Sequence, residues 1–413
     1  MNDPGFHNSV RRSRYGVLLT AALVLLAACA DGKIADVEFD LWTQEGEAEE
    51  AQEFVDSLAE RYMEENESVT INVVRKDTEE LGEDFRSSAI AGSAPELLWT
   101  VNDHAGPMAA AGIIQPIDDL YEVDDYIEPV VIGGEVYGMP VSSGTHLMLL
   151  YNRSMVEQAP ENTDEMISIA QEHTAGETYG LVYNTTEPFW LVPWLGGFGG
   201  SVFAEDGVTP TLNTPEMEAT LQFLYDLTHK HEITPVQADY GTMDTLFKEG
   251  NAAMIVNGDW SLGEYEEQLG DDLGIAPLPT VSETGMEPAP YTSGKYFMMA
   301  AGVEGKTREA IGAFMKWATS EENQLKMTDE LTRLPGRLSA LEHEQIASDP
   351  IRSGSAQAMA KGVPQPAARQ MRANWNAMLP SQRAVLAGNM APAEAAAEMQ
   401  SVAETARARR RRP

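Results

Sequence analysis

Short apolar runs alternate with amphipathic stretches along the first quarter of the chain. Residues 37–41 and 69–73 alternate between apolar and polar side chains, which predicts two strands. Between them, residues 47–65 place their apolar side chains on one face of a helix. A strand, a helix and a strand in this order predict a parallel pair joined by a right-handed crossover. The short run 97–101 is apolar throughout, as in a strand buried on both faces, so this part of the chain is predicted to be α/β.

The pattern predicts a second α/β region further along. Near residues 138–151 the chain leaves the first region and enters a new apolar strand. Thr214 is a suitable N-cap for a helix whose first position is Pro215. The stretch 279–292 is rich in proline and favours a crossing between domains. From about residue 349 to the end, the pattern is mainly helical.

The N-terminus has the features of an export signal. A basic segment precedes an apolar stretch over residues 17–28, which is too short to span a bilayer comfortably. That stretch ends in Leu-Ala-Ala-Cys, which resembles the cleavage box of bacterial lipoproteins, and Cys29 is the only cysteine. We therefore expect a signal peptide over 1–28, lipid attachment to Cys29 and a spacer over 29–36. An ordinary signal with an incidental cysteine is the alternative. No later stretch is apolar enough to span a bilayer.

Length and charge narrow the class of protein. The chain has 413 residues, which is enough for two domains. Its formal net charge is -37, and such a charge repels nucleic acid phosphates and anionic lipid heads. We therefore expect no nucleic acid partner. The chain also has no Gly-x-x-x-x-Gly-Lys-Ser/Thr loop, so ATP hydrolysis is not expected.

Metal chemistry has little support in the sequence. A single cysteine excludes both an intramolecular disulfide framework and a multi-cysteine metal site. His229 and His231 are the only close histidine pair, but side chains two residues apart do not share a helix face. No metal and no other cofactor is therefore expected.

A series of short segments gives the chain a recognisable signature. They lie at residues 91–96, 111–114, 116–118, 134–140, 151–153, 247–254 and 257–260. In this order and spacing they resemble the family-1 extracellular solute-binding proteins of bacteria, most closely the maltose- and maltodextrin-binding branch. The resemblance covers nearly everything from residue 37 to about residue 397.

The resemblance implies a fold and an organisation. It implies a two-lobe periplasmic-binding-protein fold of the α/β class, with a multi-strand hinge and a ligand between the lobes. The boundaries that we expect are 37–142 plus 284–348 for the N-terminal lobe, 143–283 plus 349–405 for the C-terminal lobe, and a basic disordered tail over 406–413.

The resemblance also implies a role. It indicates a lipid-anchored, exported binding subunit of an ABC importer, held at the cell envelope, which is not an enzyme. As a monomer it would capture an oligosaccharide such as maltose, a maltodextrin or another α-glucoside. It would then deliver that sugar to the permease subunits in the membrane.

The candidate site combines carboxylates with aromatic rings, because a sugar presents both hydroxyl groups and apolar CH faces. By resemblance, Asp103 matches a hydroxyl-accepting aspartate, and His104 stands where the branch has an arginine. The segment 187–189 resembles the glutamate-proline-tyrosine turn of the branch, and Lys295 could border the cleft. The full set of expected ligand-binding residues is Gln44, Glu45, Asp103, His104, Thr145, Glu187, Phe189, Trp190, Tyr240, Trp260, Tyr296 and Trp375.

The sequence departs from the branch in two places. Residues 143–146 read Ser-Gly-Thr-His, where the branch has a glutamate and one residue fewer. The identity of the sugar therefore stays open, with trehalose or a longer oligosaccharide as candidates. The stacking tryptophan of the branch falls on Thr100 here, and the neighbouring Trp99 could equally belong to the core.

Other functional classes remain as alternatives. A receptor for a polyamine would use acids and aromatic rings, whereas one for glycerol phosphate would need clustered arginines. A glycoside hydrolase would use a carboxylate pair such as Asp103 and Glu187, provided that the two flank a glycosidic bond at about 5–10 Å.

Overall fold

The computed structural model describes residues 37–45, 49–77, 80–120 and 122–409. The expected signal peptide, Cys29 and the spacer lie outside these residues. Within the described ranges, no helix combines the length and the apolar character that crossing a membrane would require.

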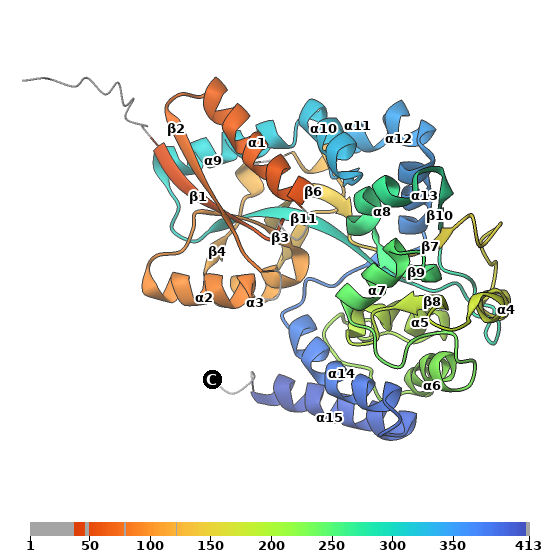
Figure 1. The fold of residues 1–413 in the computed structure, drawn as a ribbon. Coiled ribbons are helices and arrows are strands. Elements are labelled where there is room, and N and C mark those ends of the chain that lie inside the picture. The colour runs from red at the N-terminus through yellow and green to blue at the C-terminus, as the bar shows by residue number, and fades with distance from the viewer. Residues whose placement is uncertain (1–36, 46–48, 78–79, 121, 410–413) are drawn as a thin grey trace, which may run out of the picture. The chain divides into compact units, whose positions relative to one another are not determined.

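Strands in the described residues form two sheets (Figure 1). The larger has nine strands and runs in the order β12-β6-β11-β3-β1-β2, with β4, β5 and β13 at its margins. The strands are β1 (Val37–Thr43), β2 (Val69–Arg75), β3 (Leu97–Val101), β4 (Ile114–Gln115), β5 (Val130–Ile132), β6 (Glu135–Gly144), β11 (Tyr291–Ala300), β12 (Leu334–Pro335) and β13 (Val363–Pro364).

The pairing in the first sheet confirms the parallel crossover predicted from the sequence. Strand β1 pairs in parallel with β2 and with β3, and helix α1 (Glu49–Glu65) connects β1 to β2. Strand β11 enters the sheet antiparallel to both β3 and β6. Helices α2 (Leu81–Ala91), α3 (Ala105–Ala110), α9 (Gly305–Ala318) and α10 (Glu321–Leu331) complete this part of the fold.

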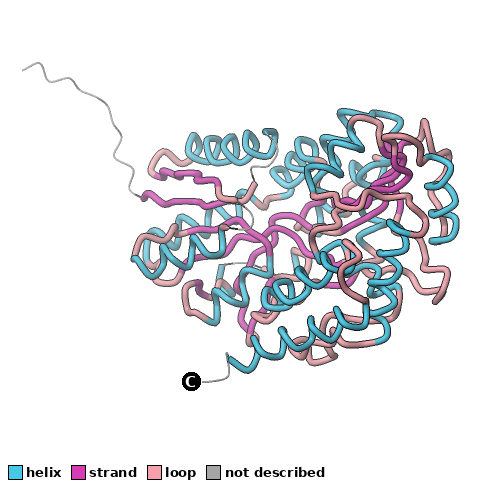
Figure 2. The backbone as a smooth tube through the Cα atoms, turned by 60° about the horizontal axis from the view of Figure 1, so that its bottom comes forward, coloured by secondary structure: helices cyan, strands magenta, loops and turns pink. Residues whose placement is uncertain are grey.

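The second sheet has four strands in the order β10-β7-β9-β8. They are β7 (Leu147–Asn152), β8 (Tyr179–Tyr183), β9 (Ala252–Gly258) and β10 (Leu273–Ala276). The helices of this part are α4 (Thr163–His173), α5 (Val192–Gly197), α6 (Pro215–His229), α7 (Tyr240–Lys248), α8 (Leu262–Leu269), α13 (Pro350–Met359), α14 (Met371–Leu386) and α15 (Pro392–Arg409). The short helix α11 (Leu338–Leu341) packs on α10 and β12 of the first part, and α12 (Glu344–Ser348) packs on α13. In Figure 2 the strands of both sheets lie between helices.

Each sheet has its own apolar core. The first core draws on residues 39–141 and 296–331, and the second on residues 147–291 and 351–403. Tyr291 belongs to the second core although it begins β11 of the first sheet. Strand β11 therefore has one end in each core.

Several local predictions hold in detail. Thr214 caps α6 by accepting a hydrogen bond from the backbone N–H of Met217. The segment from 350 onward is mainly helical, as expected. Helices α14 and α15 lie side by side and pack against α6 (Figure 1).

One expectation needs correction. Helix α15 continues to Arg409, so residues 406–409 are helical rather than disordered. Alanine and arginine are strong helix formers, and arginine is favourable at a helix C-terminus, which explains the continuation. Residues 410–413 lie outside the described part of the chain. Strand β11 begins at Tyr291, within the stretch 279–292 that favours a crossing between domains, and it runs from the second core into the first.

Candidate ligand-binding site

Aromatic side chains expected at the site gather beside the second sheet. We call Phe189, Trp190, Tyr240, Trp260 and Trp375 the aromatic cluster. The ring of Phe189 lies 5.8 Å from Trp190, 6.1 Å from Trp260 and 6.2 Å from Trp375, measured between ring centroids. The ring of Trp190 lies 6.2 Å from Tyr240 and 6.1 Å from Trp260. The angles between these planes run from 52° to 82°, so the rings meet edge to face or tilted.

The ends of β8 and β9 position this cluster. Phe189 and Trp190 lie in a 3-10 turn, η4 (Pro188–Trp190), soon after β8. Trp260 lies in a similar turn, η5 (Asp259–Ser261), directly after β9. Because β8 and β9 run parallel, their carboxyl ends meet at one edge of the sheet.

Hydrogen bonds fix the rings in place. Trp190 donates through Nε1 to the carbonyl of Val256 at 2.8 Å, and Trp260 donates to the hydroxyl of Tyr240 at 3.0 Å. Tyr240 begins α7, whose N-cap is Asp239. Trp190 is buried, whereas the other four rings are partly exposed and can offer apolar area to a ligand.

Polar side chains gather at the carboxyl ends of β1 and β3. We call Gln44, Glu45, Thr100, Asp103 and His104 the polar corner. The Thr100 hydroxyl donates to Gln44 Oε1 at 2.6 Å and lies 2.8 Å from His104 Nδ1. Since the hydroxyl proton points to Gln44, the Thr100 oxygen can accept from His104. Asp103 and His104 belong to the 3-10 turn η1 (Asn102–His104), which follows β3.

Asp103 has an acceptor atom with no partner. Its side chain is 6 % exposed, and its Oδ1 has no hydrogen-bond partner among the described residues. A buried oxygen without a donor is costly, so this atom is suited to accept a hydrogen bond from a ligand hydroxyl group.

Glu45 is held by two cations. Arg333 contacts its Oε2, and Lys295 Nζ lies 3.7 Å from its Oε1. Burial alone would raise the pKa of this carboxyl, but the neighbouring Arg333 and Lys295 charges lower the pKa of Glu45 to about 2. Glu45 is therefore ionised throughout the physiological range.

Strand β11 links the aromatic cluster to the polar corner. The ring of Tyr291, at its start, lies 6.2 Å from Trp375. Lys295, which contacts Glu45, follows four residues later on the same strand. An extended strand rises about 3.3 Å per residue, so the two points are separated by roughly 13 Å.

A second link runs through the turn that joins β6 to β7. Gly144 has a φ of 125°, and a Cβ added there would lie 2.2 Å from Asp259 Oδ2. Asp259 also accepts a hydrogen bond from the His146 backbone N–H at 3.2 Å. Because Trp260 follows Asp259 directly, the β6–β7 turn lies beside the aromatic cluster.

The remaining expected residues have different placements. Glu187 is exposed beside the aromatic cluster, and its backbone carbonyl accepts a hydrogen bond from Gln382. Thr145 lies in the β6–β7 turn with a φ of 45°. Tyr296 is 4 % exposed and packs in the core of the first sheet. Adjacent strand residues point to opposite faces, so the side chains of Tyr296 and Lys295 point away from each other.

Sequence reasoning missed two residues of this arrangement. Arg333 carried no local signal, because its contact with Glu45 joins segments far apart in the chain. Tyr291 stood in a proline-rich stretch that hid the start of β11. Trp99 is fully buried against Phe297, which is the core alternative considered for it.

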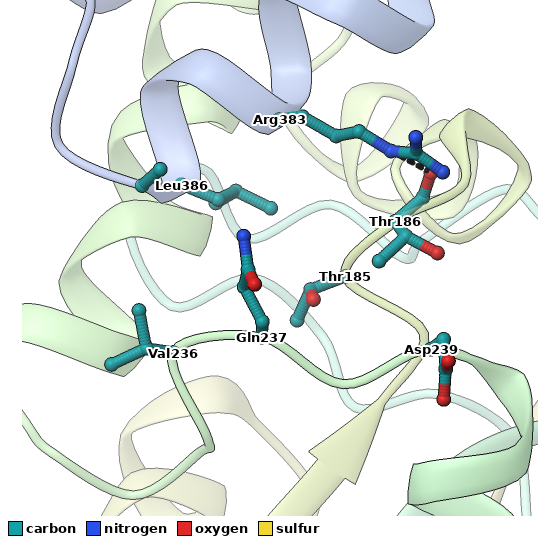
Figure 3. A pocket seen from close by; sticks show the side chains of 8 residues that line it. Thr185, Thr186, Val236, Gln237, Asp239, Arg383 and Leu386 are labelled. Carbon is teal, nitrogen blue, oxygen red and sulfur yellow. Dashed lines mark hydrogen bonds between the residues drawn. The ribbon is translucent and has the colours of Figure 1, made fainter.

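Two cavities lie outside both groups. One, of about 280 Å³, is lined by Thr185, Thr186, Gln237, Asp239 and Arg383 together with Val236, Leu386 and Ala387 (Figure 3). Arg383 points to Thr186 and donates to its carbonyl at 2.9 Å. Since Glu187 follows Thr186 and Tyr240 follows Asp239, this cavity borders the aromatic cluster. The other, of about 640 Å³, lies between α3, the β5–β6 hairpin and residues 366–370.

The histidine pair has a structural setting. His229 Nε2 lies 2.8 Å from the carbonyl oxygen of Leu386, and its ring stacks on Tyr225 at 4.2 Å. Within the described ranges, no group of three or more His, Cys, Asp or Glu side chains is arranged to hold a metal ion.

Comparison with known proteins places this architecture in a family. Residues 57–354 match the family model of the bacterial extracellular solute-binding proteins. The chain therefore belongs to this family of binding proteins, as its sequence signature predicted.

Relatives with assigned ligands bind oligosaccharides. The maltotriose-binding protein of Pyrococcus abyssi is 29% identical, over 84% of this chain and 76% of the relative. The maltodextrin-binding protein MdxE of Bacillus subtilis is 24% identical, over 78% of this chain and 80% of the relative.

Solved structures confirm the fold class. The maltose/maltodextrin-binding domain MalE from Bdellovibrio bacteriovorus, bound to maltotriose, superposes with a TM-score of 0.85 at 34% identity. The superposition covers 90% of this chain and 100% of the Bdellovibrio chain. The maltotriose-binding protein of Thermus thermophilus gives a TM-score of 0.81 at 26% identity, over 89% of this chain and 99% of that one. The expected α/β periplasmic-binding-protein fold is thus confirmed.

Proposed function

We propose that this protein is the substrate-binding lipoprotein of an ABC importer and that it captures a linear oligosaccharide of the maltotriose type. The observation that carries the proposal is the arrangement along β11. Partly exposed aromatic rings lie toward one end, and hydroxyl-binding polar groups lie about 13 Å further along.

This arrangement suits the two surfaces of a sugar. The CH faces of sugar rings can lie on Phe189, Trp260 and Trp375, where each buried Å² of apolar surface contributes about 25 cal/mol. The hydroxyl groups can bond with Asp103, His104 and Gln44. A single ligand that touches both groups would hold the two lobes together.

The relatives support this ligand class. The relatives from Pyrococcus abyssi and Bacillus subtilis are named for binding maltotriose and maltodextrin, and the Bdellovibrio structure holds maltotriose. Residues 143–146 contain no acid, so the contacts around one sugar unit differ from those of the branch. Trehalose therefore belongs in any ligand screen.

The proposed transport cycle depends on closure of the two lobes around the sugar. The lobes are residues 37–142 plus 284–348 and residues 143–283 plus 349–405, with the strands between them as the hinge. To move a population from 1:99 to 99:1, the sugar must favour the closed form by about 5.5 kcal/mol. The closed monomer would then dock on a membrane permease, while lipid on Cys29 keeps it at the outer face of the membrane.

A thermal-shift screen of the mature protein tests the ligand. A ligand that binds only the native state raises Tm as its concentration rises. We expect maltotriose to raise Tm and Trp260→Ala or Trp375→Ala to abolish that shift, because each change removes apolar area from the aromatic cluster. Trp317→Ala is the matched control, since Trp317 packs on Tyr62 of the first core, and its shift should match that of the wild type.

The outcomes separate the functional classes. If both cluster variants respond like the wild type, the site assignment is wrong. A shift with spermidine and none with sugars would indicate a polyamine receptor. Chromatography of the recovered sugar should show it unchanged, whereas shortened products would indicate a glycoside hydrolase.

A further inference from the structure

We propose that Glu45 and Lys295 bind one hydroxyl group of the ligand between them, and that Arg333 positions Glu45 for this contact. This inference rests on the proposed function, because it assigns specific roles within the sugar site. Arg333 has no signal in the sequence, and the resemblance suggests for Lys295 only a place at the border of the cleft.

The carboxylate of Glu45 is only half satisfied. The side chain is 2 % exposed, and Arg333 contacts Oε2. Its other oxygen, Oε1, has no hydrogen-bond partner among the described residues. Lys295 Nζ lies 3.7 Å from Oε1, which is too far for a hydrogen bond.

A hydroxyl group fits this gap chemically. A charged oxygen that is buried without a donor carries a large desolvation penalty, which a ligand donor can relieve. A hydroxyl group donates one proton and also accepts, so it can donate to Glu45 Oε1 and accept from Lys295. A hydrogen bond to a charged group is about twice as strong as one between neutral groups.

The pair lies at the edge of the sheet that carries the rest of the polar corner. Glu45 follows Gln44, which is bonded to Thr100. On the other side, Lys295 pairs in the sheet with Val101, two residues before Asp103. A sugar that donates a hydrogen bond to Asp103 is therefore within reach of Glu45 and Lys295.

Arg333 acts through Glu45. Its side chain is 8 % exposed and lies between α10 and β12, where Thr332 adopts a φ of 53°. The Thr332 hydroxyl donates to Glu266 Oε2 of α8 at 3.3 Å, so this loop is fixed on both sides. A guanidinium anchored there holds the Glu45 carboxylate in one orientation, with Oε1 directed to Lys295.

The pH dependence of sugar binding tests whether Arg333 positions Glu45, because Arg333 also affects the ionisation of Glu45. The charged groups that face its carboxylate are Arg333 from the α10–β12 loop and Lys295 from β11, with Asp103 and His104 on the neighbouring turn. Without Arg333, burial dominates and the pKa of Glu45 rises. Protonated Glu45 is a poorer acceptor, so the variant should bind sugar less well as the pH falls.

Titration calorimetry of the mature protein with maltotriose tests the inference. We expect Lys295→Met and Glu45→Gln each to weaken binding about tenfold, or about 1.4 kcal/mol. Lys295→Arg should restore most of the affinity because it keeps a donor. Lys316→Met, at an exposed position of α9, is the matched control and should bind like the wild type.

The pH profile separates positioning from mere packing. In the wild type Glu45 stays ionised from about pH 7 to about pH 4.5, because its pKa is about 2. The affinity of each variant is therefore compared with that of the wild type at the same pH, so that the effects of other titrating groups cancel. Arg333→Met should lose affinity across that window. If Arg333→Met does not fold, Lys295→Met should show the same loss, because it also removes a cation beside Glu45.

A monodeoxy series of maltotriose identifies the hydroxyl. Several derivatives should bind the wild type about tenfold less tightly than the parent sugar, and one of them should bind Glu45→Gln as tightly as the parent sugar does. If Lys295→Met binds within about twofold of the wild type, or if no derivative loses its penalty in Glu45→Gln, the inference is overturned. If the wild type itself does not bind maltotriose, the proposed function fails first and this inference fails with it.

Discussion

At the scale of single residues, Gly144 shows how closely the turn between the sheets is packed. Its φ of 125° is a conformation that residues with a side chain rarely adopt, and the space beside it holds the carboxylate of Asp259. Asp259 also binds the backbone of His146 and precedes Trp260. The turn therefore needs glycine both for its backbone angle and for the approach of the carboxylate.

Gly144→Ala should destabilise the protein by about 3 kcal/mol, because strained backbone and overpacking act together. Gly92→Ala is the matched control: its φ is 73°, but nothing lies within 4 Å of the added Cβ. It should lose only about 1 kcal/mol. Urea unfolding measures both free energies. Equal losses would show that the contact with Asp259 contributes nothing.

At the scale of elements, α7 connects a helix cap to the aromatic cluster. Asp239 accepts a hydrogen bond from the Thr242 backbone N–H at 2.8 Å, and the residue between cap and helix interior is Tyr240. Hydrogen bonds from the Thr242 side chain and backbone lower the pKa of Asp239. Its stabilisation is therefore present above the ordinary pKa of an aspartate and is lost as the pH falls through the lowered value.

Asp239→Ala should cost about 1 kcal/mol of stability at neutral pH and should weaken maltotriose binding, because the start of α7 frays beside Trp260. Asp239→Asn keeps the cap, so its stability at neutral pH should stay close to that of the wild type. It should not show the loss of stability at acid pH that protonation of the aspartate causes. Urea unfolding at several pH values and calorimetry check both effects. An unchanged affinity in Asp239→Ala would separate the cap from the site.

Elements with local signals could be predicted from the sequence, and those defined by distant contacts could not. The alternation in 37–41 and 69–73 and the Thr214 cap depend on neighbours in the chain, and the structure has the strands and helix there. The antiparallel pairing of β11 with β3 and β6 depends on residues far away in sequence, so periodicity says nothing about it.

The same contrast applies to the site. The family resemblance pointed to the aromatic cluster, whose members then came together in the structure. It could not show the contact between Arg333 and Glu45, because the sequence does not indicate which charged residues on separate elements form an ion pair. It also could not show that Tyr296 packs in the first core, because the register of β11 sets which face of the sheet this side chain takes.

At the scale of the whole molecule, the net charge of -37 sets the response to salt. Like charges on one surface repel each other and destabilise the compact state. Raising the salt concentration from about 0.01 M to about 1 M shortens the Debye length from about 30 Å to about 3 Å. The repulsion is then largely screened.

We therefore expect the Tm of the mature protein to rise by several degrees over that range of NaCl, as measured by calorimetry. The affinity for maltotriose serves as the internal control, because a neutral ligand gains little from screening, and it should change by less than about twofold. A Tm that falls or stays constant would show that self-repulsion does not limit stability.

Strand β11 has a consequence for the size of ligand that the protein can accept. Tyr291 and Lys295 share one face of the strand. Their spacing therefore sets the distance between the aromatic cluster and the polar corner. Inserting one residue between them would turn Lys295 to the opposite face, and inserting two would restore the face but lengthen the gap by about 7 Å. Insertions in β11 can therefore change the preferred length of the sugar only in steps of two residues.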